Sequence, residues 1–596
     1  MRASAAQAVA QAAQGFRRNP VGRTRDPAWP ALLAQLGTRV NVERDSRVRG
    51  MLALSLGRLP YATPQEMLQA QEWLIALAGD LRGDASTDVA RGIETFARLT
   101  RERVPLAEPL LAPVRGLARD ERADPPARRS ALGALLAAKA ADSATLNSAL
   151  RSADPLLRRL AFAGVAGGSD PEARAALLLV GVTDASALVR AEALRHWARV
   201  TGETACVRLL EATRDTVPMV GLLALDLTGS SCAGNPQASR ILLAVAWDST
   251  ARWQRQAHAL VSLARVAPAG TREALGAARS APVWQLRMYA ARAALLLRDT
   301  TTLRRLATDP TANVREAVLG ALRELSGHSE DSLYRAALRV SDYQLVLTAA
   351  NALAGSPEPR KAAAALLAAL ERISRERSET SRDPRLAILA RLAELGGPDL
   401  APRLRRYLED FDPVVADSAA ALLASWTGRA ARARPRPLVP VPLSLGELAR
   451  LRGKRLRFSM ASGASFDVAL LVDAAPLTVL RVVGLAARGY YDGLTFHRVV
   501  PNFVIQGGSP GANEYAGQPR FMRDELGPLS HQRGTLGIST RGRDTGDAQL
   551  FVNLVDNPRL DYDYTVWGRV ISGMEAVDGI LEGEVIRRVT LVAPSP

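Results

Sequence analysis

The sequence is short of several residue types, and each shortage excludes a class of protein or site. Only 5% of its 596 residues are aromatic, and only two, Cys206 and Cys232, are cysteines. Two cysteines cannot form a four-ligand zinc site by themselves. Free buried thiols are the default interpretation, and a single disulfide remains open if the protein is exported.

Long hydrophobic runs are also missing. No apolar stretch approaches the ~18 residues that a membrane-spanning helix requires. Residues 1–20 contain no apolar segment of the signal-peptide type. The chain as given is therefore expected in the cytoplasm, or in the periplasm if the natural N-terminus lies upstream. At this length one hydrophobic core is not enough, and two or more domains are expected.

Lysine is scarce, since it occurs only at Lys139, Lys361 and Lys454, yet the net charge is +17. Such an excess ordinarily indicates nucleic acid or an anionic surface as a partner. Residues 444–596 contain 17 Arg and Lys against 16 Asp and Glu, so the excess lies in the N-terminal part. There the arginines recur singly, without interleaved aromatic residues. A solvated helix surface is therefore favoured, and nucleic acid is not expected as a partner.

An Asp-containing unit, often Asp-Pro, recurs along residues 1–428. Copies stand at residues 45–54, 154–161, 184–194, 309–318 and 412–419. Asp followed by Pro favours the N-cap and first turn of a helix, and the Val, Leu and Ala that follow form one apolar stripe. One helical pair cannot bury that stripe alone, so neighbouring units must stack. The pattern resembles short HEAT repeats and predicts an all-α, HEAT-like superhelical solenoid over residues 1–428.

The resemblance to HEAT repeats implies that the solenoid binds a protein, which the sequence does not identify. It also implies that the recurrent arginines are structural and bond to the preceding turn or unit. His196, His258 and His328 lie too far apart for a metal-binding motif. No metal site and no cofactor are predicted.

Residues 490–508 form the most informative stretch of the chain. After a turn dipeptide, residues 494–500 alternate as a strand does, which predicts Phe496 and Arg498 on one face and His497 on the other. A second apolar run and a glycine pair follow. An arginine beside an apolar patch suits a neutral peptide, because the arginine can bind a carbonyl of the peptide and the patch can hold an apolar ring. The alternative is an edge strand with a solvated arginine.

This stretch resembles the signature of the cyclophilin-type peptidyl-prolyl cis-trans isomerases. The resemblance runs from about Arg455 to Leu591, with further matching segments in family order at residues 466–472, 475–486, 534–539, 548–552, 564–570 and 573–578. It implies a closed antiparallel β-barrel with two helices at residues 444–596. It also implies a bacterial-looking enzyme without a cofactor, which isomerises Xaa-Pro bonds of proline-containing proteins or peptides and assists protein folding. The alternative is a non-catalytic scaffold that binds proline-containing segments.

The resemblance also assigns the site residues. Arg498 is expected to be catalytic, because a guanidinium stays protonated and can donate a hydrogen bond to the prolyl nitrogen of the twisted bond. The remaining groove residues, by the same resemblance, are Phe503, Val504, Gln506, Thr540, Arg541, Gln549, Phe551, Leu560 and Tyr564.

Four positions depart from the common family pattern. Val504 stands where methionine is frequent, Thr540 where asparagine is frequent, and Tyr564 where histidine is frequent. Arg559 takes a position at which many members have tryptophan. The resemblance therefore implies an active enzyme that the cyclic peptide ciclosporin inhibits weakly.

Residues 429–443 separate the two expected domains and are rich in arginine and proline. Such a composition favours extended, polyproline-like structure and a semi-rigid spacer. A plain linker is preferred to the alternative of a pseudo-substrate that occupies the isomerase groove.

Overall fold

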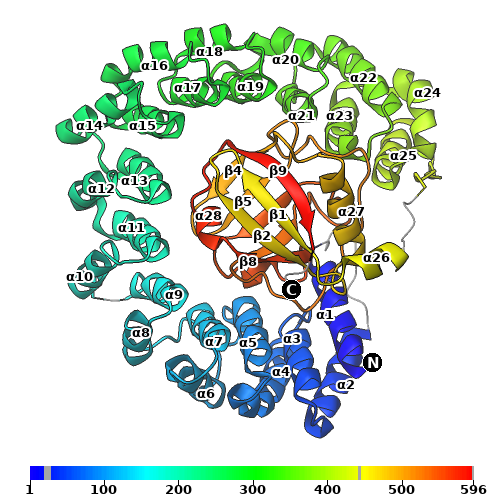
Figure 1. The fold of residues 1–596 in the computed structure, drawn as a ribbon. Helices are drawn as coiled ribbons and strands as arrows, with labels where there is room; N and C mark the ends of the chain where they lie inside the picture. Colours follow the sequence, from blue (N-terminus) through cyan, green and yellow to red (C-terminus); the bar gives the residue numbers. More distant parts are fainter. Residues whose placement is uncertain (19–27, 169, 440–444, 594–596) are drawn as a thin grey trace.

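The structure, a computed structural model, describes residues 1–18, 28–168, 170–439 and 445–593. A curved array of helices surrounds a β-barrel, and the last helices of the array come round to the side on which the first ones lie (Figure 1). The array is the predicted all-α solenoid. Its helices are α1 (Arg2–Arg18), α2 (Ala28–Val42), α3 (Ser46–Leu56), α4 (Pro64–Leu77), α5 (Ser86–Thr100), α6 (Glu108–Arg119), α7 (Pro125–Ala137), α8 (Ser143–Leu150), α9 (Pro155–Val165), α10 (Pro171–Gly181), α11 (Ala187–Thr201), α12 (Cys206–Ala212), α13 (Pro218–Ser231), α14 (Pro236–Trp247), α15 (Trp253–Val266), α16 (Arg272–Ala278), α17 (Trp284–Leu296), α18 (Thr300–Leu306), α19 (Ala312–Ser326), α20 (Asp331–Ala337), α21 (Tyr343–Ala352), α22 (Pro359–Arg375), α23 (Arg382–Leu395), α24 (Ala401–Leu404) and α25 (Pro413–Thr427).

Three of the five Asp-containing units begin helices as predicted, whereas α11 starts three residues after Asp184, and Thr311, not Asp309, is the N-cap of α19. Asp154 and Asp412 are N-caps whose carboxylates accept hydrogen bonds from the backbone, and a proline follows each at the first helical position. Asp45 caps α3 in the same way by accepting from the N–H of Val48. These caps satisfy N–H groups that would otherwise lack partners at the helix start.

Arginines link consecutive units of the solenoid. Arg158 pairs with Asp184 at 2.9 Å, and Arg190 pairs with Asp215 at 2.7 Å. Arg190 Nη1 also donates to the carbonyl of Asp184 at 2.8 Å. The predicted bond to the preceding turn is thus present, but the carboxylate partner belongs to the following unit. Arg287 and Asp309 repeat this arrangement further along.

Cys206 and Cys232 form a disulfide, so the default expectation of free thiols is wrong. Cys206 begins α12 and Cys232 follows the last residue of α13. The packing of these two helices brings the Cα atoms to 5.3 Å, within the range that a disulfide bridges. The bond therefore joins two neighbouring units at their ends.

The barrel follows the solenoid. Its strands are β1 (Arg455–Met460), β2 (Ser465–Leu470), β3 (Thr495–Phe496), β4 (Arg498–Val500), β5 (Val504–Gly507), β6 (Thr535–Ile538), β7 (Leu550–Asn553), β8 (Val566–Ser572) and β9 (Glu584–Val592). All pairs are antiparallel, in the order β3-β9-β1-β2-β8-β6-β7-β5-β4. Because only His497 separates β3 from β4, the two edges of this order meet and the barrel is nearly closed. The predicted pair of helices is α27 (Pro476–Ala487) and α28 (Met574–Asp578), and a short helix, α26 (Leu445–Leu451), precedes the barrel.

The interruption at His497 corrects the predicted alternation. Phe496 is fully buried in the core, whereas Arg498 is exposed, so the two side chains do not share a face. The chain passes from pairing with β9 to pairing with β5 at this point. The regular alternation of side chains between the two faces of a strand is therefore interrupted at His497.

The segment after α25 is attached to the last solenoid unit. Helix α25 ends at Thr427, and Gly428 follows with a positive φ of 66°. The N–H groups of Arg434 and Arg436 then donate to backbone carbonyls of residues 408 and 410. This part of the predicted spacer is held against the helices, and residues 440–444 lie outside the described ranges.

The barrel makes buried contacts with the inner helices of the array. Arg91 of α5 pairs with Asp561 at 2.6 Å, and the two residues are 5% and 2% exposed. Arg58 lies 4.5 Å from the ring centre of Tyr562, and both are buried. Breaking a buried ion pair typically costs ~3–5 kcal/mol, because it leaves a charge without a partner. The solenoid and the barrel are therefore parts of one packed assembly.

None of the described helices combines the length and apolar character needed to cross a membrane. Within the same residues, no group of His, Cys, Asp and Glu side chains is arranged to hold a metal ion.

Candidate functional site

A row of paired residues crosses four neighbouring strands of the barrel. Arg498 on β4 pairs with Gln506 on β5, which pairs with Phe551 on β7, which pairs with Gly537 on β6. Residues directly opposite each other in a sheet project from the same face. The register therefore brings a cation, an amide and an aromatic ring into one line, although 53 positions along the chain separate Arg498 from Phe551.

Gly537 makes room for the aromatic member of this row. A Cβ atom at this position would lie 2.3 Å from Cζ of Phe551, far inside van der Waals contact. The ring of Phe551 thus lies directly over the glycine, and a side chain there would push it out of position. Gly537 was missed by the sequence analysis, although it stands inside one of the family-like segments.

Phe551 is 5% exposed and belongs to an aromatic group at the base of the site. His531 stacks against it at 5.6 Å with 24° between the rings, and Tyr564 meets it edge-on at 5.7 Å. Burial lowers the pKa of His531, whose ring nitrogens are hydrogen-bonded to the carbonyl of Tyr564 and to Asn553 while its face packs on Phe551. Leu560 ends the short 3-10 helix Pro558–Leu560, which lies between Phe551 and Tyr564 in the chain.

Hydrogen bonds orient the guanidinium of Arg498. Its Nη1 donates to Oε1 of Gln506 at 3.2 Å, and Nε2 of Gln506 donates to Oγ of Ser539 at 2.9 Å. Gln506 Nε2 also approaches Oε1 of Gln549 at 3.4 Å, and Gln549 donates to two backbone carbonyls, those of Glu514 and Ala516. Gln506 is 3% and Gln549 1% exposed, whereas Arg498 is exposed. The buried side chains of Gln506 and Gln549 therefore orient the solvent-exposed guanidinium of Arg498.

Ser539 is a second residue that the sequence analysis missed. It follows β6 directly and accepts a hydrogen bond from Gln506. In the sequence, Ser539 stands out only as the last residue of the cyclophilin-like segment 534–539.

Phe503 lies between two arginines. The guanidinium carbon of Arg498 is 6.0 Å from the ring centre of Phe503, and that of Arg559 is 4.6 Å from it. Contacts of this kind with an aromatic face are attractive. Phe503 is half-buried, so part of its ring remains available at the groove.

Val504 is almost fully buried, as are Gln506, Gln549 and Phe551, whereas Thr540 is partly buried. Val504 is 3% exposed on β5. Within the described residues, Thr540 has a buried Oγ1 without a hydrogen-bond partner. Its hydroxyl is out of reach of solvent, so a peptide passing there would meet its backbone or methyl group.

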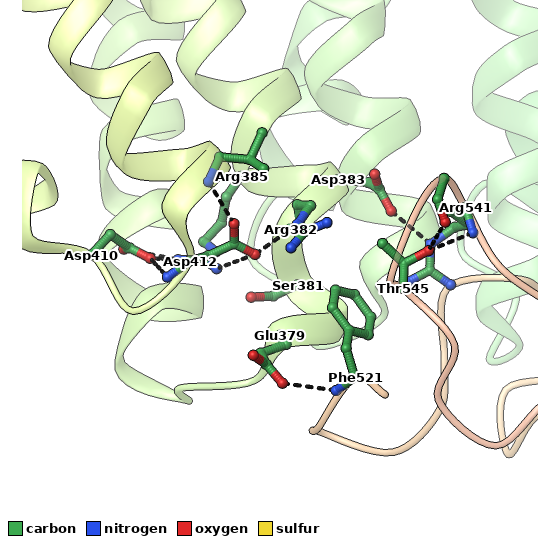
Figure 2. A network of polar contacts seen from close by, with 12 residues as sticks. Glu379, Ser381, Arg382, Asp383, Arg385, Asp410, Asp412, Phe521, Arg541 and Thr545 are labelled. Atoms are coloured by element: carbon green, nitrogen blue, oxygen red, sulfur yellow. Dashed lines mark hydrogen bonds and ion pairs between the residues drawn. The ribbon is translucent and has the colours of Figure 1, made fainter. Parts of the chain in front are cut away.

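Arg541 lies at the other side of the groove and is bound to the solenoid. Its Nε donates to Asp383 of α23 at 2.6 Å, and its backbone N–H donates to Thr545 Oγ1 at 2.8 Å (Figure 2). Its guanidinium carbon also lies 5.0 Å from the ring centre of Tyr515. Figure 2 shows a neighbouring contact, in which Glu379 accepts a hydrogen bond from the N–H of Phe521.

The opposite rim of the groove is bound by α11. Asn502, which precedes Phe503, donates to the carbonyl of Leu188 at 3.0 Å and to Glu192 at 2.9 Å. His196 and Arg159 hold the pKa of Glu192 at about 2 against the opposing effect of its burial. Asn502 and Arg541 are therefore both bound to solenoid helices, while Arg498 stays exposed.

The arrangement suits a peptide and contains no chemistry for breaking one. An exposed cation with an amide partner can hold a peptide carbonyl or the nitrogen of a twisted amide, and the half-buried ring of Phe503 can pack against an apolar ring. These features define a peptide-binding β-barrel.

Comparisons with known proteins identify the family. The family model described as cyclophilin type peptidyl-prolyl cis-trans isomerase/CLD matches residues 455–593. Peptidyl-prolyl cis-trans isomerase B of Bacillus subtilis is 38% identical over 134 residues, which are 22% of this chain and 94% of the relative. A peptidyl-prolyl cis-trans isomerase of Helicobacter pylori is 40% identical over 124 residues, covering 20% of this chain and 76% of the relative. The chain belongs to the cyclophilin-type peptidyl-prolyl cis-trans isomerase family and is a peptidyl-prolyl cis-trans isomerase.

A crystal structure of a Cryptosporidium parvum cyclophilin type peptidyl-prolyl cis-trans isomerase, in the presence of the dipeptide Ala-Pro, is also similar. It is 23% identical and covers 23% of this chain and 99% of that chain, with a TM-score of 0.22.

Proposed function

We propose that Arg498 is the catalytic residue of this isomerase and that it acts on the prolyl nitrogen. Rotation about a peptide bond costs ~18–20 kcal/mol, because the nitrogen lone pair is delocalised into the carbonyl. In the twisted bond that lone pair is localised and can accept a hydrogen bond. The exposed guanidinium of Arg498 supplies such a donor. The observation that carries this proposal is its hydrogen bond to Gln506, which orients an otherwise exposed guanidinium.

The other groove residues would bind the substrate. Phe503, Val504, Phe551, Leu560 and Tyr564 would hold the proline ring, while Gln506, Gln549, Thr540 and Arg541 would line the path of the peptide backbone. These groups would bind the planar and the twisted substrate about equally, whereas the hydrogen bond from Arg498 would strengthen only in the twisted state. Catalysis would then be stabilisation of the transition state by a positioned donor.

Arg498→Ala tests this role. We expect kcat/KM for a short Xaa-Pro peptide to fall by at least ~100-fold, in the range found for removal of one transition-state donor. The fold should persist, because Arg498 is exposed. Arg588→Ala is the matched control, since Arg588 is an exposed strand arginine on β9, which carries none of the groove residues. Full activity in Arg498→Ala would refute the assignment. Peptide binding without isomerisation by the unmodified chain would favour the alternative, a non-catalytic scaffold.

We further propose that the solenoid, residues 1–428, is of the HEAT-like class and binds the protein client, with residues 429–443 as the connection to the isomerase at 444–596. Three large apolar side chains on α10, α12 and α14 support a protein-binding role: Val180 is 66%, Val207 62% and Trp247 46% exposed. Such side chains gathered on consecutive units suit an unfolded, proline-containing chain.

Substituting these three residues by serine tests the solenoid's role. Proline-limited refolding of a protein client should slow several-fold, while isomerisation of a short peptide stays unchanged. Leu68→Ser is the control, because Leu68 is 50% exposed on α4, away from these units. Equal effects on both substrates would contradict client binding at this surface.

A further inference from the structure

A cavity lies between the solenoid and the rim of the isomerase groove. It has a volume of about 340 Å³ and is bounded by α5, α7, α9 and α11 on one side and by residues 555–559 of the barrel on the other. Asn502, which precedes Phe503 in sequence, and Arg559, whose guanidinium carbon lies 4.6 Å from the ring centre of Phe503, line it. Through the contact between Arg559 and Phe503, the cavity adjoins the expected proline pocket.

Positive charge predominates among the residues that line this cavity. Six arginines line it against three carboxylates, and five of the arginines come from the solenoid. Three ion pairs within the lining account for the carboxylates: Arg98 with Glu94, Arg129 with Asp556 and Arg159 with Glu192.

Two cations at the groove end of the cavity have no carboxylate partner among the described residues. Arg559 makes its close contact with the ring of Phe503. Arg195 of α11 donates from Nη2 to the carbonyl of Pro501 at 2.6 Å. Burial lowers the pKa of both guanidinium groups; Arg98 lowers that of Arg559 further, and the nearby charge of Glu192 offsets only part of the effect on Arg195. Both would gain from a neighbouring negative charge.

A buried donor also lacks a partner. Arg159 is 9% exposed, and its Nε has no hydrogen-bond partner within the described part of the chain. Leaving a buried charged donor unsatisfied is costly, and an anion in the cavity would relieve that cost.

From these observations we propose that the cavity is a subsite for an acidic group of the client, a carboxylate or phosphate carried by a residue close to the isomerised proline. Arg98 and Arg195 of the solenoid and Arg559 of the barrel would bind the oxyanion. This inference rests on the proposed placement of the proline at Phe503 and adds a substrate class to it: proline segments flanked by acidic residues. The solenoid would then set the local sequence preference of the isomerase.

The test measures kcat/KM of the full-length chain for a series of short Xaa-Pro peptides. One is neutral, and the others carry glutamate or phosphoserine at successive positions on either side of the proline. We expect an acidic residue at one or more of these positions to raise kcat/KM by about tenfold. The gain should shrink between 50 and 500 mM NaCl as charge screening increases. A larger gain with phosphoserine than with glutamate would identify phosphate as the preferred group, and equal gains would identify the carboxylate.

Arg98→Gln should reduce the acidic gain to threefold or less, with the rate for the neutral peptide unchanged. Arg208→Gln is the matched control, since Arg98 and Arg208 are both helix arginines paired with a nearby glutamate and both side chains are 45% exposed. Glu94→Gln/Arg98→Gln removes the buried carboxylate together with its partner, and it serves if the single variant does not fold.

Two results would overturn the inference: equal kcat/KM for acidic and neutral peptides at every position, or an acidic gain that survives loss of Arg98. In either case, turnover of the neutral peptide shows that the isomerase itself is intact. No turnover of any peptide by the unmodified chain would instead count against the proposed proline site.

Discussion

At the scale of single residues, the site depends on how neighbours hold Arg498 and Phe551. Gln506 and Gln549 are buried; Gln506 accepts from Arg498 and donates to Ser539, and Gln549 donates to two backbone carbonyls, so they fix the direction of an exposed arginine. Gly537 leaves the space that Phe551 occupies. Neither function is visible in local sequence patterns, because each depends on which strand lies alongside.

Gly537→Ala should therefore damage the proline pocket. The added Cβ would lie 2.3 Å from the Phe551 ring and would displace it. We expect kcat/KM for a short peptide to fall at least ~10-fold, together with a loss of stability of ~1–3 kcal/mol from overpacking. Gly484→Ala on α27 is the control, because the nearest atom to its Cβ is the flexible end of Arg488 at 3.6 Å. Activity equal to that of the control would show that the ring does not need this space.

The burial of His497 predicts how the folding stability depends on pH. Burial and the charge of Arg498 lower the pKa of His497 to about 4. The unfolded state, with a histidine pKa near ~6.5, then binds a proton at higher pH than the folded state. The free energy of unfolding should fall as the pH drops from about 6.5 to about 4. Below about pH 4, protonation of His497 should cause no further loss. The loss is at most ~3 kcal/mol.

Urea unfolding at pH 7 and pH 4.5 measures this effect. His497→Gln cannot take up the proton, so it should lose less stability between the two pH values than the unmodified chain. An identical loss in both proteins would mean that His497 is not the group responsible.

At the scale of elements, the sequence predicted the caps at Asp45, Asp154 and Asp412 and the order of the barrel segments, because both depend on local patterns. It failed at His497, where the strand exchanges one partner for another, so that Phe496 and Arg498 lie on opposite sides of the barrel wall. It also left the cysteines as free thiols, since only the packing of α12 on α13 shows that their Cα atoms are close.

The disulfide should stabilise the solenoid locally. It closes a loop with a sequence separation of 26 residues, for which the loss of chain entropy in the unfolded state corresponds to ~3 kcal/mol. Cys206→Ala/Cys232→Ala should therefore unfold at a lower urea concentration than the unmodified chain under oxidising conditions. The two proteins should become similar in the presence of a reductant. No difference under oxidising conditions would show that the bond contributes little to stability.

The contact between α23 and the groove makes a further prediction at this scale. Asp383 holds Arg541 at the groove rim (Figure 2). Asp383→Asn would free the arginine side chain, so we expect KM for a short peptide to rise about two- to fivefold with little change in kcat, as for loss of binding shared by ground and transition states. Asp399→Asn, an exposed residue near the same helix, is the control. An unchanged KM would show that the solenoid does not position this rim.

At the scale of the whole molecule, the chain closes a helical array around its own isomerase. The contacts that do so join residues far apart in sequence: Arg91 and Asp561 are separated by 470 positions. The two domains were each predictable from their patterns, but their mutual packing was not, because no local signal relates a solenoid arginine to a carboxylate in the barrel. The same packing creates the arginine-lined cavity beside the groove.

The central claim is that the intact chain is an isomerase whose groove stays open inside this array. Two-dimensional exchange NMR on a short Ala-Pro peptide, with the full-length chain at about one hundredth of the peptide concentration, tests it most directly. The account predicts cis-trans exchange peaks that are absent from the peptide alone and absent with Arg498→Ala. A folded, full-length chain that produces no exchange would contradict the account, because the groove would then be closed or inactive in the complete protein.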